Sequence, residues 1–208
     1  MDSLRAISHC FPDRPMLSRW PISACHKIKI VATIFTIGHS TRALADFSRI
    51  IQAHEIRLLV DIRAFPMSRR HPHFNQERLE LWLPEIGSDY LWEKNLGGRR
   101  GQQMPPDQSP NIALRNPAFR NYADYMLSDQ FQVAVDQLLE RAGKGNTTIM
   151  CAEQFYFHCH RMLVSDYLVS QGHIVLHILD EKPPTPHVLT KEARVMDGRL
   201  VYRGDYLL

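Results

Sequence analysis

The sequence predicts an α/β fold, with a mainly parallel sheet, flanking helices and a C-terminal β-hairpin. Apolar strand-like runs alternate with helical patterns over residues 28–179, which is the order of a parallel α/β sheet. The runs are apolar on both faces, as strands buried between two layers of helices are. Residues 193–203 alternate in polarity around Asp197-Gly198, a dipeptide typical of a tight hairpin turn.

The first three predicted elements are a strand, a helix and a strand. Residues 28–37 are apolar and rich in β-branched side chains, so they favour a strand. A helix capped by Ser40 or Thr41 then runs to about His54. Its apolar residues recur at helical spacing: Leu44, Phe47, Ile50 and Ile51. Residues 56–62 are again apolar on both faces and predict a second buried strand.

The middle of the chain predicts a short helix and a third strand between two loops. Residues 64–75 contain two prolines and the basic run Arg69-Arg70-His71, which predicts a loop. A short helix over residues 77–83 and a strand over residues 90–92 follow. Residues 101–117 are rich in Gln, Pro, Asn and Asp, and unstructured loops of this length tend to be functional lids or disordered insertions.

The second half of the predicted sheet repeats the alternation. The expected elements are helices over residues 119–126 and 131–142, a central strand at residues 147–151, a helix from about Cys159 to Gly172, and a strand over residues 173–179. The helix stops at Gly172 because glycine commonly ends helices.

Length and composition favour one domain. A chain of 208 residues with 44% hydrophobic content can bury one sizeable core. We expect residues 28–208 to form a single α/β domain. Residues 1–27 lack both helical and strand periodicity and contain Phe11-Pro12-Asp13-Arg14-Pro15, so we expect a disordered N-terminal extension.

Charge and cysteine usage exclude several classes of protein. The net charge of +3 and pI of 8.7 are compatible with an anionic partner without requiring one. The four cysteines show no spacing of a disulfide-rich secreted domain. No apolar run approaches the ~18–20 residues that span a bilayer, and the N-terminus makes a poor secretory signal. We therefore expect a cytoplasmic protein without membrane association, and leave its oligomeric state open.

Polar side chains follow four of the predicted strands. The carboxyl ends of parallel strands share one edge of a sheet, where ligands bind. We therefore expect these side chains to converge on one site. They are His39 and Ser40, Asp61 and Arg63, Asn95 and Arg99, and Cys151 and Glu153.

Several of these motifs together resemble a known family. The segments are Phe35-Thr36-Ile37-Gly38-His39-Ser40-Thr41, Leu59-Val60-Asp61-Ile62-Arg63, Leu96-Gly97-Gly98-Arg99, Tyr122-Ala123-Asp124-Tyr125-Met126, Cys151-Ala152-Glu153 and Cys159-His160-Arg161. They closely resemble the family catalogued as domain of unknown function 488, over about residues 33–203. The resemblance implies an α/β domain linked to nucleic-acid or repair contexts, with no assigned activity.

Cys151 is the first candidate for a reactive group. A cysteine at a strand end before a helix is similar to the nucleophile loop of rhodanese-like and phosphatase-like domains, where backbone N–H groups and an arginine lower the thiol pKa. Those loops close from Cys to Arg over five residues, whereas Arg161 lies much farther along the chain. A buried structural thiol is the alternative.

A metal site is a second hypothesis. Cys151, Cys159 and His160, with His39 or Glu153 as a fourth ligand, would suit zinc or iron. The spacing between these residues is not a standard zinc signature. The main expectation is therefore that the protein needs no cofactor, with a zinc or iron site as the alternative.

The combined hypothesis is an enzyme acting on a phosphate-bearing substrate, a nucleotide or a nucleic acid. The candidate catalytic groups are Cys151, Glu153, His39 and Asp61, and the candidate substrate-binding groups are Arg63, Arg69, Arg99, Arg161, Ser40 and Asn95. Guanidinium groups suit phosphate because their planar fork donates two hydrogen bonds. Two alternatives stay open. One is a non-catalytic nucleic-acid-associated domain, and the other is a metal-binding protein using Cys151, Cys159 and His160.

Overall fold

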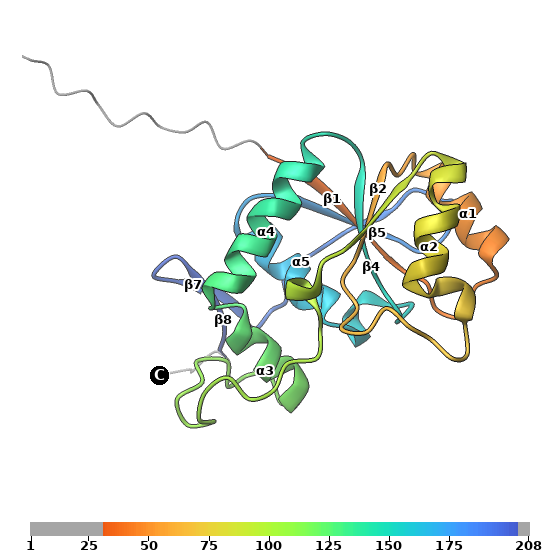
Figure 1. Ribbon diagram of the computed structural model, residues 1–208. Coiled ribbons are helices and arrows are strands. Elements are labelled where there is room, and N and C mark those ends of the chain that lie inside the picture. The colour runs from red at the N-terminus through yellow and green to blue at the C-terminus, as the bar shows by residue number, and fades with distance from the viewer. Residues whose placement is uncertain (1–30, 204–208) are drawn as a thin grey trace, which may run out of the picture. The chain divides into compact units, whose positions relative to one another are not determined.

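The computed structural model describes residues 31–203, which form a six-stranded sheet with helices on both faces (Figure 1). The strand order is β3-β2-β4-β1-β5-β6. The first five strands pair in parallel, and β6 (Thr185–Pro186) runs antiparallel to β5. These five are β1 (Thr33–Gly38), β2 (Leu58–Asp61), β3 (Asp89–Trp92), β4 (Thr147–Cys151) and β5 (Ile174–Ile178). The predicted α/β class is confirmed.

The C-terminal hairpin is also confirmed, and it lies outside the main sheet. Strands β7 (Ala193–Met196) and β8 (Arg199–Tyr202) pair antiparallel as a separate two-stranded sheet. The turn between them uses Asp197 and Gly198, both with positive φ, as the sequence predicts for this dipeptide.

Two helical layers cover the two faces of the main sheet (Figure 1). The helices are α1 (Leu44–Ala53), α2 (Gln76–Trp82), α3 (Pro117–Tyr125), α4 (Asp129–Ala142) and α5 (Arg161–Ser170). Short 3-10 turns are η1 (Pro72–Phe74), η2 (Pro84–Ile86), η3 (Lys94–Leu96) and η4 (Tyr156–His158). Helices α1 and α2 pack on one face, whereas α3, α4 and α5 pack on the other.

Strand β4 illustrates why the central strands are apolar on both sides. Ile149 belongs to the hydrophobic cluster under α4 and α5, and Met150 belongs to the cluster under α1 and α2. Both side chains are fully buried. Successive side chains of a strand point to opposite faces, so a strand between two helical layers buries side chains on both faces.

Two predictions of where helices begin were wrong or incomplete. Helix α1 begins at Leu44 after Ala43, with no side-chain cap, whereas Ser40 adopts a left-handed φ of 51°. The backbone N–H of Ser40 donates to the Ala152 carbonyl at 2.8 Å, so this segment pairs with the end of β4 instead of starting a helix. Helix α5 begins at Arg161, because the turn η4 precedes it.

Strand β6 had not been expected, since two residues carry too little periodicity to predict a strand. The predicted N-terminal extension and the first residues of the first predicted strand lie outside the described residues.

The loop over residues 101–117 is anchored by buried polar contacts. Ser109 and Asn111 each donate a hydrogen bond of 2.7 Å to the Asp124 carboxylate in α3. The Asn111 side-chain oxygen also accepts from the backbone N–H of Tyr202 in β8, at 2.9 Å. These contacts fix the middle of the loop between α3 and the hairpin.

The strand order places a crevice between β1 and β4. The connection from β1 to β2 runs through α1 on one face, and the connection from β4 to β5 runs through α5 on the other. Where connections leave two neighbouring parallel strands in opposite directions, their carboxyl ends leave room for a ligand. None of the helices within residues 31–203 is long and apolar enough to cross a membrane.

Candidate functional site

A cleft of about 390 Å³ opens at the carboxyl ends of β1, β2 and β4. It brings together seven of the residues predicted from the sequence: His39, Arg63, Arg99, Cys151, Glu153, Cys159 and His160. An adjoining hollow shares His39 and Glu153 with the cleft and adds Ser40, Arg70 and His71. The expected convergence at one rim of the sheet therefore holds for most of the predicted groups.

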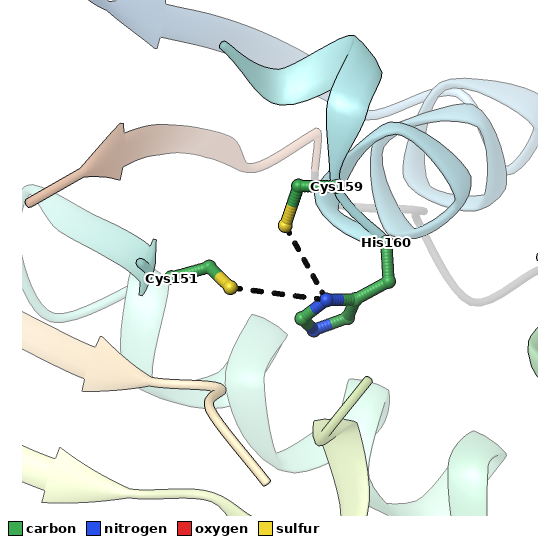
Figure 2. A group of neighbouring side chains, drawn as sticks. All are labelled: Cys151, Cys159 and His160. Carbon is green, nitrogen blue, oxygen red and sulfur yellow. Dashed lines mark hydrogen bonds between the residues drawn. The ribbon is translucent and has the colours of Figure 1, made fainter. Parts of the chain in front are cut away.

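Two thiols and an imidazole meet at the floor of the cleft, and Figure 2 shows their reactive atoms pointing toward one another. The His160 Nδ1 lies 3.9 Å from the Cys151 Sγ and 3.4 Å from the Cys159 Sγ. All three atoms lie within 4.8 Å of one another. Cys151 comes from the end of β4, whereas Cys159 and His160 directly precede α5, so two elements assemble the cluster.

The orientation of the His160 ring is fixed from both sides. Its Nε2 lies 3.1 Å from the Ile62 carbonyl oxygen, which can only accept, so Nε2 carries the proton and donates. The lone pair of Nδ1 is therefore free to face the two sulfur atoms. Gly98 lies against the same ring, since a Cβ at this position would be 2.4 Å from Nδ1. The chain thus needs glycine at position 98 for this close approach.

The two thiols differ in acidity. The pKa of Cys159 is lowered to about 7, because its sulfur accepts a hydrogen bond from the Cys151 thiol and lies near the Arg161 charge, although burial opposes the shift. The pKa of Cys151 is raised by that same hydrogen bond and by burial. The backbone N–H of Arg161 also donates to the Cys159 sulfur, at 3.5 Å. The hydrogen bond from Cys151 and, to a smaller extent, the first turn of α5 therefore favour the Cys159 thiolate, whereas the sequence pattern predicts this effect for Cys151.

Asp61 and Arg63 form a buried ion pair beside the cleft. The Arg63 Nε donates to both carboxylate oxygens of Asp61 at 2.9 Å, and the Tyr90 hydroxyl donates to Oδ2 at 2.8 Å. Despite burial, the pKa of Arg63 is raised by Asp61. Asp61 is fully buried and its oxygens are occupied, so it holds Arg63 in place below the cleft and does not line it.

His39 is held as a neutral imidazole. Its Nδ1 lies 2.9 Å from the Ser40 carbonyl oxygen and donates to it, and its Nε2 accepts from the Arg63 Nη1 at 3.3 Å. Burial and the neighbouring Arg63 charge lower the pKa of His39 to about 4. Phe74 stacks on the ring with a centroid separation of 4.4 Å. His39 is thus an oriented hydrogen-bonding group at neutral pH.

Arg161 approaches the site from inside the protein. Its side chain is 1% exposed, and its Nη2 donates to the carbonyl oxygens of Glu153 and Gln154. Its Nη1 donates to the Thr36 hydroxyl at 3.3 Å. Arg161 therefore fixes the backbone of the loop after β4, while the Glu153 side chain stays exposed in the cleft.

A family comparison adds one finding to this geometry. The model described as "Domain of unknown function DUF488" matches residues 43–168, which is more than half of the chain. The chain belongs to the DUF488 family. The resemblance inferred from its motifs is confirmed. No curated protein and no solved structure gives a significant match.

The matched part of the DUF488 domain contains the whole thiol–imidazole cluster. The remaining predicted residues are placed at the edge of the site or outside it. Ser40 lines the adjoining hollow, whereas Arg69 and Asn95 are exposed and line neither cavity. Arg99 is exposed at the rim, where its guanidinium lies 5.6 Å from the centre of the Phe65 ring.

A buried polar chain supports the site from behind and had not been predicted. Asp166 Oδ1 lies 2.9 Å from His187 Nε2, and His187 Nδ1 lies 2.9 Å from His177 Nε2. His177 Nδ1 lies 2.7 Å from the Thr36 hydroxyl, which also accepts from Arg161. The chain links a buried carboxylate to a buried guanidinium. No local sequence signal identifies it, because its members come from four separate elements.

The buried imidazoles predict an acid-sensitive fold. The pKa of His39 falls to about 4 and that of His177 to about 3, both mainly through burial, from 6.5. Below pH 6.5 the unfolded chain takes up protons that the folded domain does not, so stability decreases as the pH falls toward 4. We expect each residue to lower the free energy of unfolding by about 2 kcal/mol between pH 7 and pH 5.

Urea unfolding across this range checks the prediction. His39→Gln should make the dependence on pH shallower, whereas His158→Gln, at an exposed position in the same cleft, should leave it unchanged. An equal slope in His39→Gln and the unaltered protein would contradict this assignment.

Proposed function

We propose that this DUF488 domain is an enzyme that acts on a phosphate-bearing substrate, a nucleotide or a nucleic-acid strand. The observation that carries the proposal is the composition of the cleft, which combines a thiol–imidazole cluster with two arginines. Among the cleft-lining residues, Glu153 alone carries a carboxylate. Because Asp61 pairs with Arg63 below the floor, the exposed Arg99 is the main reason to expect an anionic substrate next to groups that can react.

The cations have separate roles in this proposal. Arg63 is fixed by Asp61 and keeps its charge beside the floor of the cleft. Arg99 is exposed over Phe65, and Arg70 is exposed in the adjoining hollow. Charge-assisted hydrogen bonds from guanidinium to phosphate are about twice as strong as neutral ones. A substrate with two phosphate groups could contact both ends of this surface.

The reacting groups follow from exposure and bonding. Glu153 is exposed in the cleft while its backbone carbonyl is held by Arg161, so its carboxylate is available to accept a proton from an attacking water molecule. His39 already accepts a hydrogen bond from Arg63, which suits a role in orienting Arg63 and the substrate. We assign the reactive centre to Cys151, Cys159 and His160.

Binding of nucleotides and short single-stranded oligonucleotides tests the anion site. Arg99→Ala should weaken binding by about 10- to 100-fold, because one charge-assisted contact contributes about 1.5–3 kcal/mol. Arg141→Ala, on helix α4 away from the cleft, is the matched control and should bind normally. The same loss in both variants would indicate diffuse charge attraction and would contradict a site.

A second candidate function is non-catalytic binding of a nucleic-acid strand. It is favoured by exposed aromatic rings near the cleft: Phe155 and Phe157 stack at 5.4 Å, and Phe65 lies at the rim under Arg99. Exposed rings interleaved with arginines suit stacking of unpaired bases. Glu153→Gln separates the two functions, because an enzyme should lose turnover and keep binding, whereas a binding domain should show no turnover in either form.

A further inference from the structure

We propose that Cys151, Cys159 and His160 form a zinc site whose fourth coordination position opens into the cleft. The reactive role of the metal rests on the proposed function. Metal binding itself can be measured without any substrate. Three features support the zinc site: the sulfur-to-nitrogen distances, the orientation of the His160 ring and the position of the three side chains in the cleft.

The distances fit tetrahedral zinc. With Zn–S bonds of about 2.3 Å and a Zn–N bond of about 2.0–2.1 Å, a tetrahedral site separates sulfur from nitrogen by about 3.6 Å. The two sulfur-to-Nδ1 distances, 3.9 and 3.4 Å, lie on either side of this value. Two thiolates and an imidazole are also a donor set that favours zinc over the harder cations.

The orientation of His160 matches that of a metal ligand. Metal-binding histidines usually donate their second ring N–H to a carbonyl or carboxylate, which fixes the tautomer. His160 makes this contact through Nε2 to the Ile62 carbonyl oxygen. Its Nδ1 then faces both sulfur atoms, with Gly98 leaving the space that the ring needs.

Three protein ligands leave one position for a water molecule or a substrate oxygen. Within residues 31–203, the Cys, His, Asp and Glu side chains that lie close enough together to hold a metal ion are these three residues. All three line the cleft that Arg63 and Arg99 also line. Catalytic zinc sites have this form, and the ion acts as a Lewis acid on the bound oxygen. A phosphate oxygen held by the arginines would lie within the same cleft.

The test uses the full chain with C10S and C25S, which leaves Cys151 and Cys159 as its two thiols. Purified protein is stripped with a chelator under reducing conditions and titrated with zinc alone. We expect one zinc ion per chain, an increase in thermal stability, and loss of affinity of at least about 100-fold in Cys159→Ser and His160→Ala. His158→Ala, an exposed imidazole of the same cleft, is the matched control and should bind zinc normally.

Replacing zinc by cobalt tests the site by spectroscopy, without a substitution at any metal-binding residue. Bound cobalt should show a thiolate-to-metal charge-transfer band and the visible bands of four-coordinate geometry. Gly98→Ala should lower metal affinity by about 10- to 100-fold, because it displaces the His160 ring. Arg99→Ala should keep full zinc affinity even if it abolishes phosphate binding, so failure of the metal site and failure of the proposed function give different results.

Three outcomes would overturn the zinc site. They are no zinc binding at micromolar concentrations by the reduced protein, a zinc affinity in Cys159→Ser or His160→Ala equal to that of the protein that keeps both ligands, and a cobalt spectrum without a thiolate band. A Cys151–Cys159 disulfide that persists under reducing conditions would also remove the proposed ligands and contradict the site.

Discussion

Arg161→Ala should destabilise the domain by about 3–5 kcal/mol, the largest single effect that we expect from a substitution near the site. The fully buried guanidinium donates to Thr36 and to the carbonyl oxygens of Glu153 and Gln154. The variant leaves these acceptors without their donor and opens a cavity the size of an arginine side chain. It also removes the cation at one end of the buried hydrogen-bonded chain, which begins at Asp166 and includes two imidazoles.

Urea unfolding at neutral pH measures this loss. Arg161→Lys should recover only part of the stability, because an ammonium group cannot donate along the same planar fork. Arg141→Ala on helix α4 should change the free energy of unfolding by about 0.5 kcal/mol or less, as surface substitutions usually do. Equal stability of Arg161→Ala and Arg141→Ala would refute the structural role of Arg161.

Gly38→Ala should destabilise the domain by about 3 kcal/mol and displace the loop that carries Glu153. A Cβ at this position would lie 1.8 Å from the Glu153 carbonyl oxygen and 2.6 Å from its carbon. The obstruction is backbone, so a change of side-chain rotamer cannot relieve it. Ser40 and Arg161 also hold this loop, through Ala152 and Glu153, and the loop must therefore move against several hydrogen bonds.

Gly101→Ala provides the matched control for this prediction. A Cβ at Gly101 meets no described atom within 4 Å, so the variant should keep the stability of the unaltered protein. Unfolding in urea gives the stability, and phosphate-ligand affinity reports the position of the loop. A Gly38→Ala protein with unchanged stability and affinity would contradict the close contact between β1 and the loop.

The sequence predicted the arrangement of the strand ends because one physical rule governs it. Parallel strands end at one edge of a sheet, so His39, Cys151 and Arg63 had to lie near one another once the strands were assigned. The family assignment followed from the same segments. These results depend on the periodicity and order of elements, which a single sequence carries well.

The roles of individual side chains depended on details that periodicity does not contain. The predicted start of α5 placed Arg161 close to the site. In the structure its guanidinium points into the protein interior, away from the cleft. The hydrogen bond from the Cys151 thiol, together with one backbone N–H, favours the thiolate of Cys159 over that of Cys151. Glycine is needed at position 98 because it contacts His160. The two residues lie too far apart in the sequence for a local pattern to predict this contact.

X-ray absorption at the zinc edge, on the zinc-loaded chain with C10S and C25S, tests directly whether the thiol–imidazole cluster binds zinc. We expect four-coordinate zinc with two sulfur atoms at about 2.3 Å and nitrogen or oxygen atoms at about 2.0–2.1 Å. This is the shell of Cys151, Cys159, His160 and one oxygen from the cleft. A shell of nitrogen and oxygen atoms alone, or one sulfur atom, would contradict the assignment of the thiol–imidazole cluster as the centre of this site.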